Sequence, residues 1–309
     1  MLLRSAISAL FFLFVLNGYS QTLPEYLPQD GLVGWWPFTG NANDSSGNGN
    51  NGVVSNAVLT SDRFGNVNAA YNFNGTNSRI DIADAAVLRC RKITLSVWVF
   101  NNNIVKTSQV LYKGSLMADG EAYGIGYSSG ISSKPNGALK LNSGCISGTG
   151  WYGLHFKSDG VNQAWEHLVM TYDGSTVAYY KNGSLDTSLA LTGLIDSCSG
   201  GGLRIGFNHL RYNVSTGDGF DGVIDDVGIW NRALTANEIS NIYTNSFGCG
   251  YGKMGINVCE PKRNLHIKDV LRLEPRDTPP GNPEKGDIYF DGTINKLRVF
   301  DGTVWQNCW

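Results

Sequence analysis

The segment GFDGVIDDVGIWNRALTANEISNIY, residues 219–243, places a strand directly before a short helix. Apolar residues dominate its first part, and we expect Ile224–Trp230 to form the closing strand of a sheet. Thr235 is followed three residues later by Glu238, which is the capping-box pattern found where helices begin. Two isoleucines in the next turns supply a narrow apolar stripe. The segment therefore predicts a strand followed by a short capped helix that covers the end of a sandwich.

Strand-like runs bounded by Gly, Asn and Asp recur along most of the remaining chain. ITLSVWVF, residues 93–100, is apolar on both faces, so we expect it in the middle of a sheet with cover on each side. KNG, residues 181–183, predicts a hairpin, because Asn-Gly tolerates the positive φ angles of a type I′ turn. The 39 glycines and the low content of charged residues (16%) are typical of short strands joined by tight turns. The predicted fold class is all-β: a two-sheet antiparallel sandwich with one short helix, followed by a small β tail.

The chain begins with MLLRSAISALFFLFVLNGYS, residues 1–20, in which one Arg precedes a mostly apolar stretch and then small and polar residues. This order is typical of a secretory signal peptide and is too short for a comfortable membrane span. No later segment approaches the roughly 20 apolar residues that a spanning helix needs. The formal net charge of −2 offers no basic surface for nucleic acid. We therefore predict a secreted protein, extracellular or at the cell surface, without a membrane span or a nucleic-acid partner.

Composition divides the mature chain into two parts. Residues 21–249 carry the strand-like runs and the capped helix, whereas residues 250–309 include a Pro-rich stretch at 275–286. The end of the chain predicts two or three short antiparallel strands with turns at Gly292 and Gly302. So few strands are rarely stable alone in water. We expect this C-terminal part to depend on the main domain, on a partner chain or on disulfides.

The chain has six cysteines: Cys90, Cys145, Cys198, Cys249, Cys259 and Cys308. No CxxC pair of the kind that binds zinc is present, and an even number of cysteines in an exported chain is typical of disulfides. The sequence does not choose among the connectivities. Local pairing favours Cys145 with Cys198 and Cys259 with Cys308. Elimination alone then leaves Cys90 with Cys249.

The order of these strands, over residues 30–246, resembles the LamG-like or laminin-G type jellyroll of the concanavalin A-like lectin/glucanase superfamily. Its most specific part is the segment 219–243. The resemblance implies that the first strand, within GLVGWWPF at 31–38, lies beside the closing strand. The tail at 250–309 resembles a module found at the ends of bacterial surface and fibre-like proteins, which implies a homotrimer held through this module.

The loop NANDSSGNGNNG, residues 41–52, contains short side chains with oxygen donors that suit Ca²⁺. Its start matches an EF-hand loop, but the bidentate Glu of the twelfth position is absent. The resemblance implies a structural calcium where this loop meets the closing strand, bound by Asp44, Asn48 and Asp225. Adjacent residues of a strand point to opposite faces, so at most one of Asp225 and Asp226 can point at the loop, and Asp225 is preferred. The alternative is that Asp44 only forms an Asx-turn and the two later carboxylates lie on a solvated edge.

Catalytic patterns are lacking in the sequence. The glucanases that the chain resembles carry ExDxxE on one strand, because alternate carboxylates must converge on one face. None of the seven Glu residues stands within a strand of another, and Glu166 is expected to be structural. The zinc-protease pattern HExxH does not occur. We predict a protein that is not an enzyme; a glycan hydrolase with an unrecognised site is the less favoured alternative.

Aromatic residues in loops are the candidate ligand-binding groups, because an aromatic ring packs against the apolar face of a sugar. The candidates are Trp151, Tyr152, His209, Arg211 and Tyr212. They predict binding of a glycan or of a cell-surface or matrix protein. Two alternatives remain: these aromatics pack on a disulfide, or the chain is a structural subunit of an extracellular fibre or adhesin. Five other tryptophans fall inside strand patterns and are expected in the core: Trp35, Trp36, Trp98, Trp165 and Trp230.

Overall fold

The computed structural model describes residues 23–114, 122–127, 133–142, 150–196, 201–207, 219–246, 254–256, 265–267 and 273–308. The chain divides into two compact units, Met1–Ser246 and Phe247–Trp309. The first unit ends close to the boundary expected after residue 249. The predicted signal peptide, residues 1–20, lies outside the described residues.

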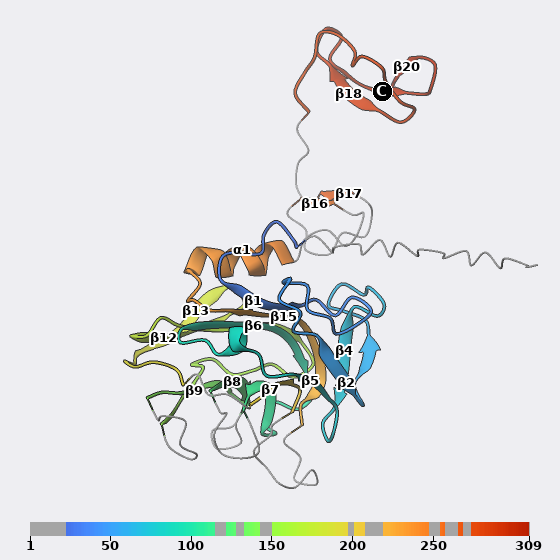
Figure 1. Ribbon diagram of the computed structural model, residues 1–309. Helices are drawn as coiled ribbons and strands as arrows, with labels where there is room; N and C mark the ends of the chain where they lie inside the picture. Colours follow the sequence, from blue (N-terminus) through green and yellow to red (C-terminus); the bar gives the residue numbers. More distant parts are fainter. Residues whose placement is uncertain are drawn as a thin grey trace, which may run out of the picture. The chain divides into compact units, whose positions relative to one another are not determined.

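The first unit is a sandwich of two antiparallel sheets (Figure 1). One has eight strands: β1 (Leu32–Trp36), β3 (Val58–Thr60), β4 (Ala70–Asn74), β6 (Ile93–Asn101), β11 (Trp165–Tyr172), β12 (Thr176–Lys181), β13 (Ser184–Ala190) and β15 (Asp221–Trp230). The other has seven: β2 (Gly52–Ser55), β5 (Arg79–Ile82), β7 (Ser108–Lys113), β8 (Tyr123–Tyr127), β9 (Pro135–Lys140), β10 (Trp151–His155) and β14 (Leu203–Ile205). A short 3₁₀ helix, η1, spans Ala86–Leu88, and α1 spans Ala236–Ser246. The predicted all-β sandwich with one short α-helix is confirmed.

The closing strand β15 pairs with three other strands. β6 lies along one side of it. On the other side, β4 pairs with Asp221–Ile224 and β1 pairs with Val227–Trp230. The first strand therefore lies beside the closing strand, as the resemblance implied. The change of partner leaves residues 225 and 226 outside both of these ladders.

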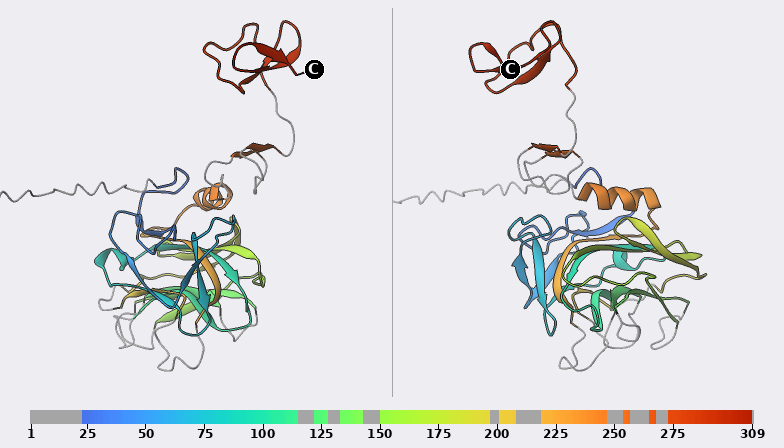
Figure 2. Two further views of the ribbon diagram at one scale, coloured as in Figure 1. Left: turned by 90° about the vertical axis from the view of Figure 1, so that its right-hand side faces the viewer. Right: turned by 180° about the vertical axis from the view of Figure 1, so that it is seen from behind.

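The central strand β6 is buried on both faces. Its odd-numbered residues lie in the core between the sheets: Ile93, Leu95, Val97 and Val99. The even-numbered residues face outward, and Thr94, Ser96 and Trp98 are also buried, because α1 and the residues around Leu27 cover most of that face; Phe100 is half-buried. Figures 1 and 2 show α1 lying across this face, so the expectation that the helix covers the end of the sandwich is wrong. Of the five tryptophans predicted in the core, four are buried and Trp165 is half-buried.

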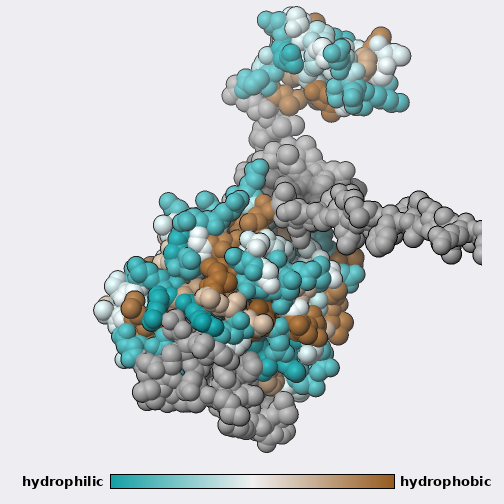
Figure 3. All heavy atoms as spheres, viewed as in Figure 1, coloured by the Kyte–Doolittle hydropathy of each residue, from teal (hydrophilic) through white to brown (hydrophobic). Residues whose placement is uncertain are grey.

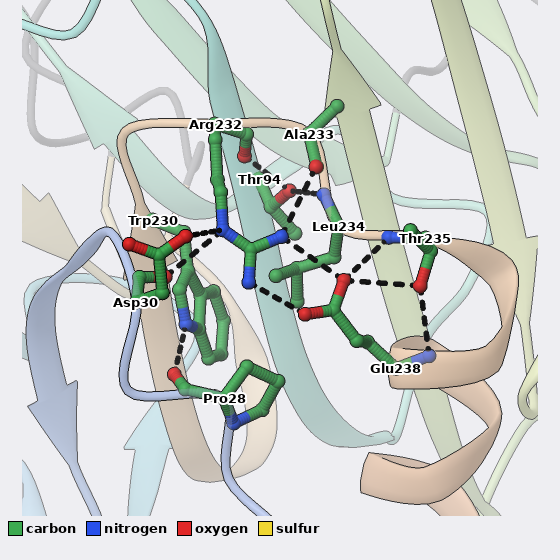
Figure 4. Close-up of polar contacts among 9 residues, drawn as sticks. All are labelled: Pro28, Asp30, Thr94, Trp230, Arg232, Ala233, Leu234, Thr235 and Glu238. Atoms are coloured by element: carbon green, nitrogen blue, oxygen red, sulfur yellow. Dashed lines mark hydrogen bonds and ion pairs between the residues drawn. The ribbon is translucent and has the colours of Figure 1, made fainter.

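The helix begins with the predicted capping box. The backbone N–H of Thr235 donates to Oε2 of Glu238 at 2.8 Å, and the N–H of Glu238 donates to Oγ1 of Thr235 at 3.2 Å (Figure 4). Arg232 binds the same carboxylate and also forms an ion pair with Asp30 at 3.0 Å. Oγ1 of Thr94 donates to the carbonyl of Arg232 at 2.7 Å. The start of α1 is thus tied both to the chain before β1 and to the central strand.

The hairpin between β12 and β13 turns at Asn182 and Gly183, which have φ angles of 50° and 76°. Two consecutive positive φ angles are the signature of the type I′ turn that the sequence predicted. A Cβ atom on Gly183 would lie 2.8 Å from the ring of Tyr243 in α1. The glycine therefore serves the turn and the packing of the helix together.

The second unit contains two small sheets. β16 (Met254–Ile256) and β17 (Leu265–Ile267) pair in parallel, and β18 (Ile288–Asp291), β19 (Lys296–Phe300) and β20 (Trp305–Asn307) form an antiparallel sheet. Tyr289 and Asp291 are its only buried residues among those described. Several large apolar side chains are exposed: Ile288, Ile294 and Val304. Figure 3 shows hydrophobic residues at the surface of this unit.

Candidate functional site

The 41–52 loop is organised by the carboxylate of Asp44. Its Oδ1 accepts hydrogen bonds from the backbone N–H groups of Trp35 at 3.0 Å and Ser46 at 2.9 Å. Its Oδ2 accepts one from the N–H of Asn50 at 2.9 Å. The side-chain amide of Asn48 donates to the carbonyl of Val33 at 3.3 Å. The loop is therefore an ordered wrap around β1 whose centre is a carboxylate bound to backbone donors.

Two neighbouring carboxylates of the closing strand, Asp225 and Asp226, both bind Arg63. Asp225 and Asp226 accept from its terminal amino groups at 2.6 and 2.7 Å, and all three side chains are at most 14% exposed. The register of β15 shifts after Asp225, and Asp226 has a φ of +44°. The prediction that the two side chains point to opposite faces is wrong, because this bulge replaces the regular alternation of a strand.

The residues predicted to hold calcium do not fit that ion as they lie. The carboxylate of Asp44 accepts hydrogen bonds from backbone N–H groups, and the charge of Asp225 is balanced by its ion pair with Arg63. In the part of the chain that the structure describes, no group of three or more His, Cys, Asp or Glu side chains is arranged to hold a metal ion. Sequence reasoning missed Arg63. The available signal was a pair of acidic residues inside an otherwise apolar strand, which requires a cation from elsewhere in the chain.

Arg63 lies in an enclosed aromatic layer beneath α1. Its guanidinium carbon is 4.5 Å from the centroid of the Trp98 ring, and Trp98 stacks on His167 at 5.1 Å. His167 Nε2 is 2.8 Å from Oγ of Ser96. Burial lowers the pKa of His167 to about 3, and the charge of Arg63 acts in the same direction. This neutral Ser–His pair is shut off from solvent, so it is a structural element and not a nucleophile with its base.

A groove lies between the free edges of the two sheets. β10 is the last strand of the seven-stranded sheet and β13 is the last strand of the eight-stranded sheet. The groove has a volume of about 230 Å³ and is lined by Tyr152, Gly153, Leu154, Val177, Tyr179, Leu189 and Leu191. Tyr152, one of the predicted ligand-binding residues, is 50% exposed, and Leu189 is 49% exposed.

The two sheet edges are fastened together beyond the groove. Asp186 of β13 accepts hydrogen bonds from the backbone N–H groups of Lys157 and Ser158, the second at 3.1 Å, and also from the Ser158 hydroxyl. Lys157 and Ser158 follow β10 in the chain. This clasp links the free edges of the two sheets, so the walls of the groove are held at a fixed separation.

The chemistry of the groove favours binding of one ring. A half-exposed aromatic side chain faces aliphatic ones, which suits the apolar C–H face of a sugar. The volume is below the roughly 300–1,000 Å³ of pockets for drug-sized ligands. No carboxylate is among the described residues that line it. This part of the lining suits contact with a ring and offers no pair of carboxyl groups of the kind that cleaves a glycosidic bond.

Glu166 is a structural residue, as expected. It is 2% exposed, forms an ion pair with Lys181 at 2.5 Å and accepts a hydrogen bond from the N–H of Val161 at 2.9 Å. A buried carboxylate with these partners joins β11, β12 and the loop before β11. It is not available to a substrate.

The remaining predicted residues are only partly placed. Trp151 precedes Tyr152 in β10 and lies opposite Lys140 of β9. The other predicted ligand-binding residues, His209, Arg211 and Tyr212, lie outside the described residues, as do four of the six cysteines: Cys145, Cys198, Cys249 and Cys259. The pairing of Cys145 with Cys198 therefore stays a prediction.

Cys90 and Cys308 are free thiols. The predicted pairs of Cys90 with Cys249 and of Cys259 with Cys308 are thus not formed in this structure. Cys90 is enclosed in the core between the sheets, where burial raises the pKa of its thiol to about 12. Cys308 lies at the exposed end of the small sheet in the second unit. An even count of cysteines did not reveal that one of them fills the core as a small apolar residue.

Comparison with known proteins gives both a family and structural relatives. The family model described as the concanavalin A-like lectin/glucanases superfamily matches residues 74–240. A search of curated protein sequences finds no match.

One similar solved structure is domain 4 of AbnA, a GH43 extracellular arabinanase from Geobacillus stearothermophilus, in complex with arabinotriose. It is 18% identical, with a TM-score of 0.55, and the match covers 69% of this chain and 98% of that one. The binding domain of botulinum neurotoxin serotype D is 14% identical, with a TM-score of 0.52. That match covers 71% of this chain and 52% of the neurotoxin domain. At these identities the likeness shows the fold.

Proposed function

The chain belongs to the concanavalin A-like lectin/glucanases superfamily, and we propose that it is an extracellular, non-catalytic protein that binds carbohydrate. The observation that carries this proposal is the open groove between the edges of the two sheets, with the half-exposed ring of Tyr152 against aliphatic side chains. The arabinanase domain of the same fold, in complex with arabinotriose, adds support by analogy. The proposed ligand is a glycan that places one ring against Tyr152.

Three observations support the proposal that the protein is not catalytic. The sequence lacks the ExDxxE pattern of the superfamily's glucanases. Three buried carboxylates of the sandwich are bound to cations, Glu166 to Lys181 and the Asp225–Asp226 pair to Arg63. The described residues that line the groove include no Asp or Glu. Release of reducing sugar from a bound glycan would overturn this part of the proposal.

The extracellular location rests on the predicted signal peptide at residues 1–20. Among the residues that the structure describes, no helix is long and apolar enough to cross a membrane. Cell fractionation with an antibody against the chain tests the location. Recovery of the full chain in the cytoplasm, with residues 1–20 still attached, would contradict it.

A glycan array probed with the full mature chain tests the function, followed by calorimetric titration of the best neutral glycan. Tyr152→Ala is expected to weaken binding about tenfold or more, because aromatic contacts contribute on the order of 1 kcal/mol beyond the burial of apolar area. Tyr152→Phe keeps the ring and is expected to bind nearly as wild type. Val58→Ala, on strand β3 at the end of the eight-stranded sheet opposite β13, changes an exposed apolar side chain away from both proposed sites and is the control. No binding to any glycan, or equal binding by Tyr152→Ala, would sink the proposal.

A second candidate function is that of a structural subunit of an extracellular fibre or adhesin, assembled as a homotrimer. It is favoured by the second unit, where the three-stranded sheet buries few side chains and leaves Ile288, Ile294 and Val304 about half exposed. A sheet of this size gains independent stability only when its apolar face is covered. Light scattering on the full chain tests it, and a particle mass equal to one chain at micromolar concentration would exclude it.

A further inference from the structure

The outer face of the seven-stranded sheet carries a carboxylate held between two arginines. Asp81 of β5 accepts a hydrogen bond from Nε of Arg79 at 2.9 Å and another from Nε of Arg204 in the neighbouring strand β14. The alternate residues Ile80 and Ile82 lie in the core, so the charged side chains face away from it. Arg79 and Asp81 are each 33% exposed and Arg204 is 15% exposed. Solvent therefore reaches a cluster that two paired strands hold in place.

This cluster has more positive than negative charge. A guanidinium offers five N–H donors, and among the described residues the terminal amino groups of Arg204 make no hydrogen bond or ion pair. Burial lowers the pKa of Arg204, the Asp81 carboxylate opposes that shift, and the charge of Arg79 adds to it. One formal positive charge is left over, although the chain as a whole has a net charge of −2. Donors for an anion remain on the same side chains.

A second carboxylate, three residues further along the chain, repeats the arrangement. Asp84 binds Arg89 at 2.6 Å and the buried ammonium group of Lys113 at 2.9 Å. These three groups again sum to one positive charge. The two clusters are separated by at most about 10 Å of extended chain. Two neighbouring positive clusters favour a polymer with repeated negative charges over a single small anion.

An exposed apolar side chain lies on one side of the arginines. Val53 of the edge strand β2 lies opposite Asp81 and is 68% exposed. On the other side of the cluster, the buried Tyr112 lies opposite Arg204, and the ring of the buried Phe207 is 5.7 Å from the Arg204 guanidinium carbon, so these two rings support Arg204 from below. Charged donors beside apolar surface suit a sugar ring that bears a carboxylate, because such a ring has one polar substituent and an apolar C–H face.

We propose that Arg79 and Arg204 bind the carboxylate groups of a polyuronate, an acidic polysaccharide. The inference rests on the proposed carbohydrate-binding function and names the class of ligand, at a second site apart from the Tyr152 groove. A guanidinium binds a carboxylate through two parallel hydrogen bonds. Asp81 holds both arginines before the ligand arrives, so less conformational entropy is lost on binding. β14 and β10 are four strands apart, about 19 Å at the usual ~4.8 Å spacing, so each site can be changed without touching the other.

Calorimetric titration of the full mature chain tests the inference. The probes are oligogalacturonate and the same oligosaccharide with its carboxylates methyl-esterified, which removes the charge and keeps the sugar. Wild type is expected to bind the acid at least tenfold more tightly than the ester, with an affinity that falls as salt rises. Arg204→Gln and Arg79→Gln are expected to lose most of this preference. Arg276→Gln, an exposed arginine of the second unit, is the matched control and is expected to bind as wild type.

Several results would overturn the inference. Equal affinity for acid and ester, unchanged binding by both arginine variants, or equally tight binding of dextran sulfate would each show that no carboxylate site exists here. Unchanged binding of a neutral glycan at the Tyr152 groove by the arginine variants shows that they are folded. If neutral glycans bind and the acid gains nothing, the inference fails and the proposed function stands. If no glycan of either kind binds, both fail.

Discussion

Asp44 is the centre of the 41–52 loop, because its carboxylate accepts three backbone hydrogen bonds. Replacing it with Ala leaves three backbone N–H groups without their acceptor. Each such loss costs on the order of 1 kcal/mol, so we expect the free energy of unfolding to fall by about 2–3 kcal/mol. Thermal melts in calcium and in chelator check this, and the drop should be equal in both. A drop that disappears in chelator would instead assign calcium to Asp44.

Arg63 is the residue whose loss should be most damaging. Arg63→Met leaves Asp225 and Asp226 buried without a cation, and breaking a buried pair in this way costs about 3–5 kcal/mol. Urea unfolding measures the cost. A triple variant that also carries Asp225→Asn and Asp226→Asn is expected to recover part of it, because the removed charges interact. Additive losses in the triple variant would contradict the pairing.

The loss of stability in the Arg63→Met variant is expected to depend on pH. Burial raises the pKa of both carboxyl groups, and Arg63 opposes that shift. In the Arg63→Met variant, the pKa values of Asp225 and Asp226 are higher in the folded state than in the unfolded state. The folded state therefore binds protons more readily, and lowering the pH through these pKa values stabilises it. The destabilisation caused by Arg63→Met should therefore be smaller near pH 4 than at pH 7.

Residue-level prediction succeeded where a side chain acts on its own neighbours and failed where it acts across the fold. The wrap of the 41–52 loop follows from short polar side chains that bind nearby backbone. The partner of Asp225 does not follow, because Arg63 is 162 residues away. The regular alternation of a strand predicted the wrong side for the Asp226 side chain. The bulge that turns it lies where the pairing partner of β15 changes from β4 to β1, and a single strand's sequence does not show that change.

At the scale of elements, the ionised Glu238 in the cap of α1 should stabilise the fold at neutral pH and lose this effect in acid. The hydrogen bonds from Arg232, and then from Thr235, lower the pKa of Glu238 to about 2 from an ordinary 4.5, against the effect of burial. A depressed carboxyl pKa contributes stability above about pH 4.5 that is lost as the pH falls toward 2. Melting temperatures of wild type and Glu238→Gln between pH 2 and 7 check this. The difference should be largest above pH 5 and vanish near pH 2; a constant difference would contradict the role of the ionised cap.

The β12–β13 turn gives a second test at this scale. Gly183→Ala combines a positive φ with a Cβ atom 2.8 Å from Tyr243, whereas at Gly174 the φ is +99° and the nearest atom would be at 3.6 Å. Strain alone costs about 1–2 kcal/mol, so Gly174→Ala isolates that part. Gly183→Ala should lose more than Gly174→Ala in denaturant unfolding. Equal losses would show that helix packing does not depend on the glycine.

The sequence predicted the elements with local signals: the Asn-Gly hairpin, the Thr235–Glu238 cap and the central strand 93–100. Each depends on neighbouring residues or on a short apolar run. The position of α1 was wrong, because nothing within the helix says whether its stripe meets an edge or a face. The aromatic and aliphatic residues that it covers, Trp35, Val169 and Trp230, come from three different strands.

At the scale of the whole molecule, the order of strands resembled a known family and so gave the two-sheet sandwich, but it did not give the site. Tyr152 was predicted as a ligand contact from its type and surroundings alone. The groove forms only because β10 and β13, which end different sheets, lie edge to edge and are fastened through Asp186. Spacing along one chain does not specify how two sheets face each other. For the same reason, the Arg79–Asp81–Arg204 cluster could not be foreseen.

The most direct test of the account is the position of a bound sugar in a crystal structure of the full mature chain with its best neutral glycan. The account predicts one ring stacked on the side chain of Tyr152, with heavy atoms within about 4.5 Å of it, between β10 and the Leu189 side of the groove. A glycan seated elsewhere on the first unit, with the groove left open, would contradict it.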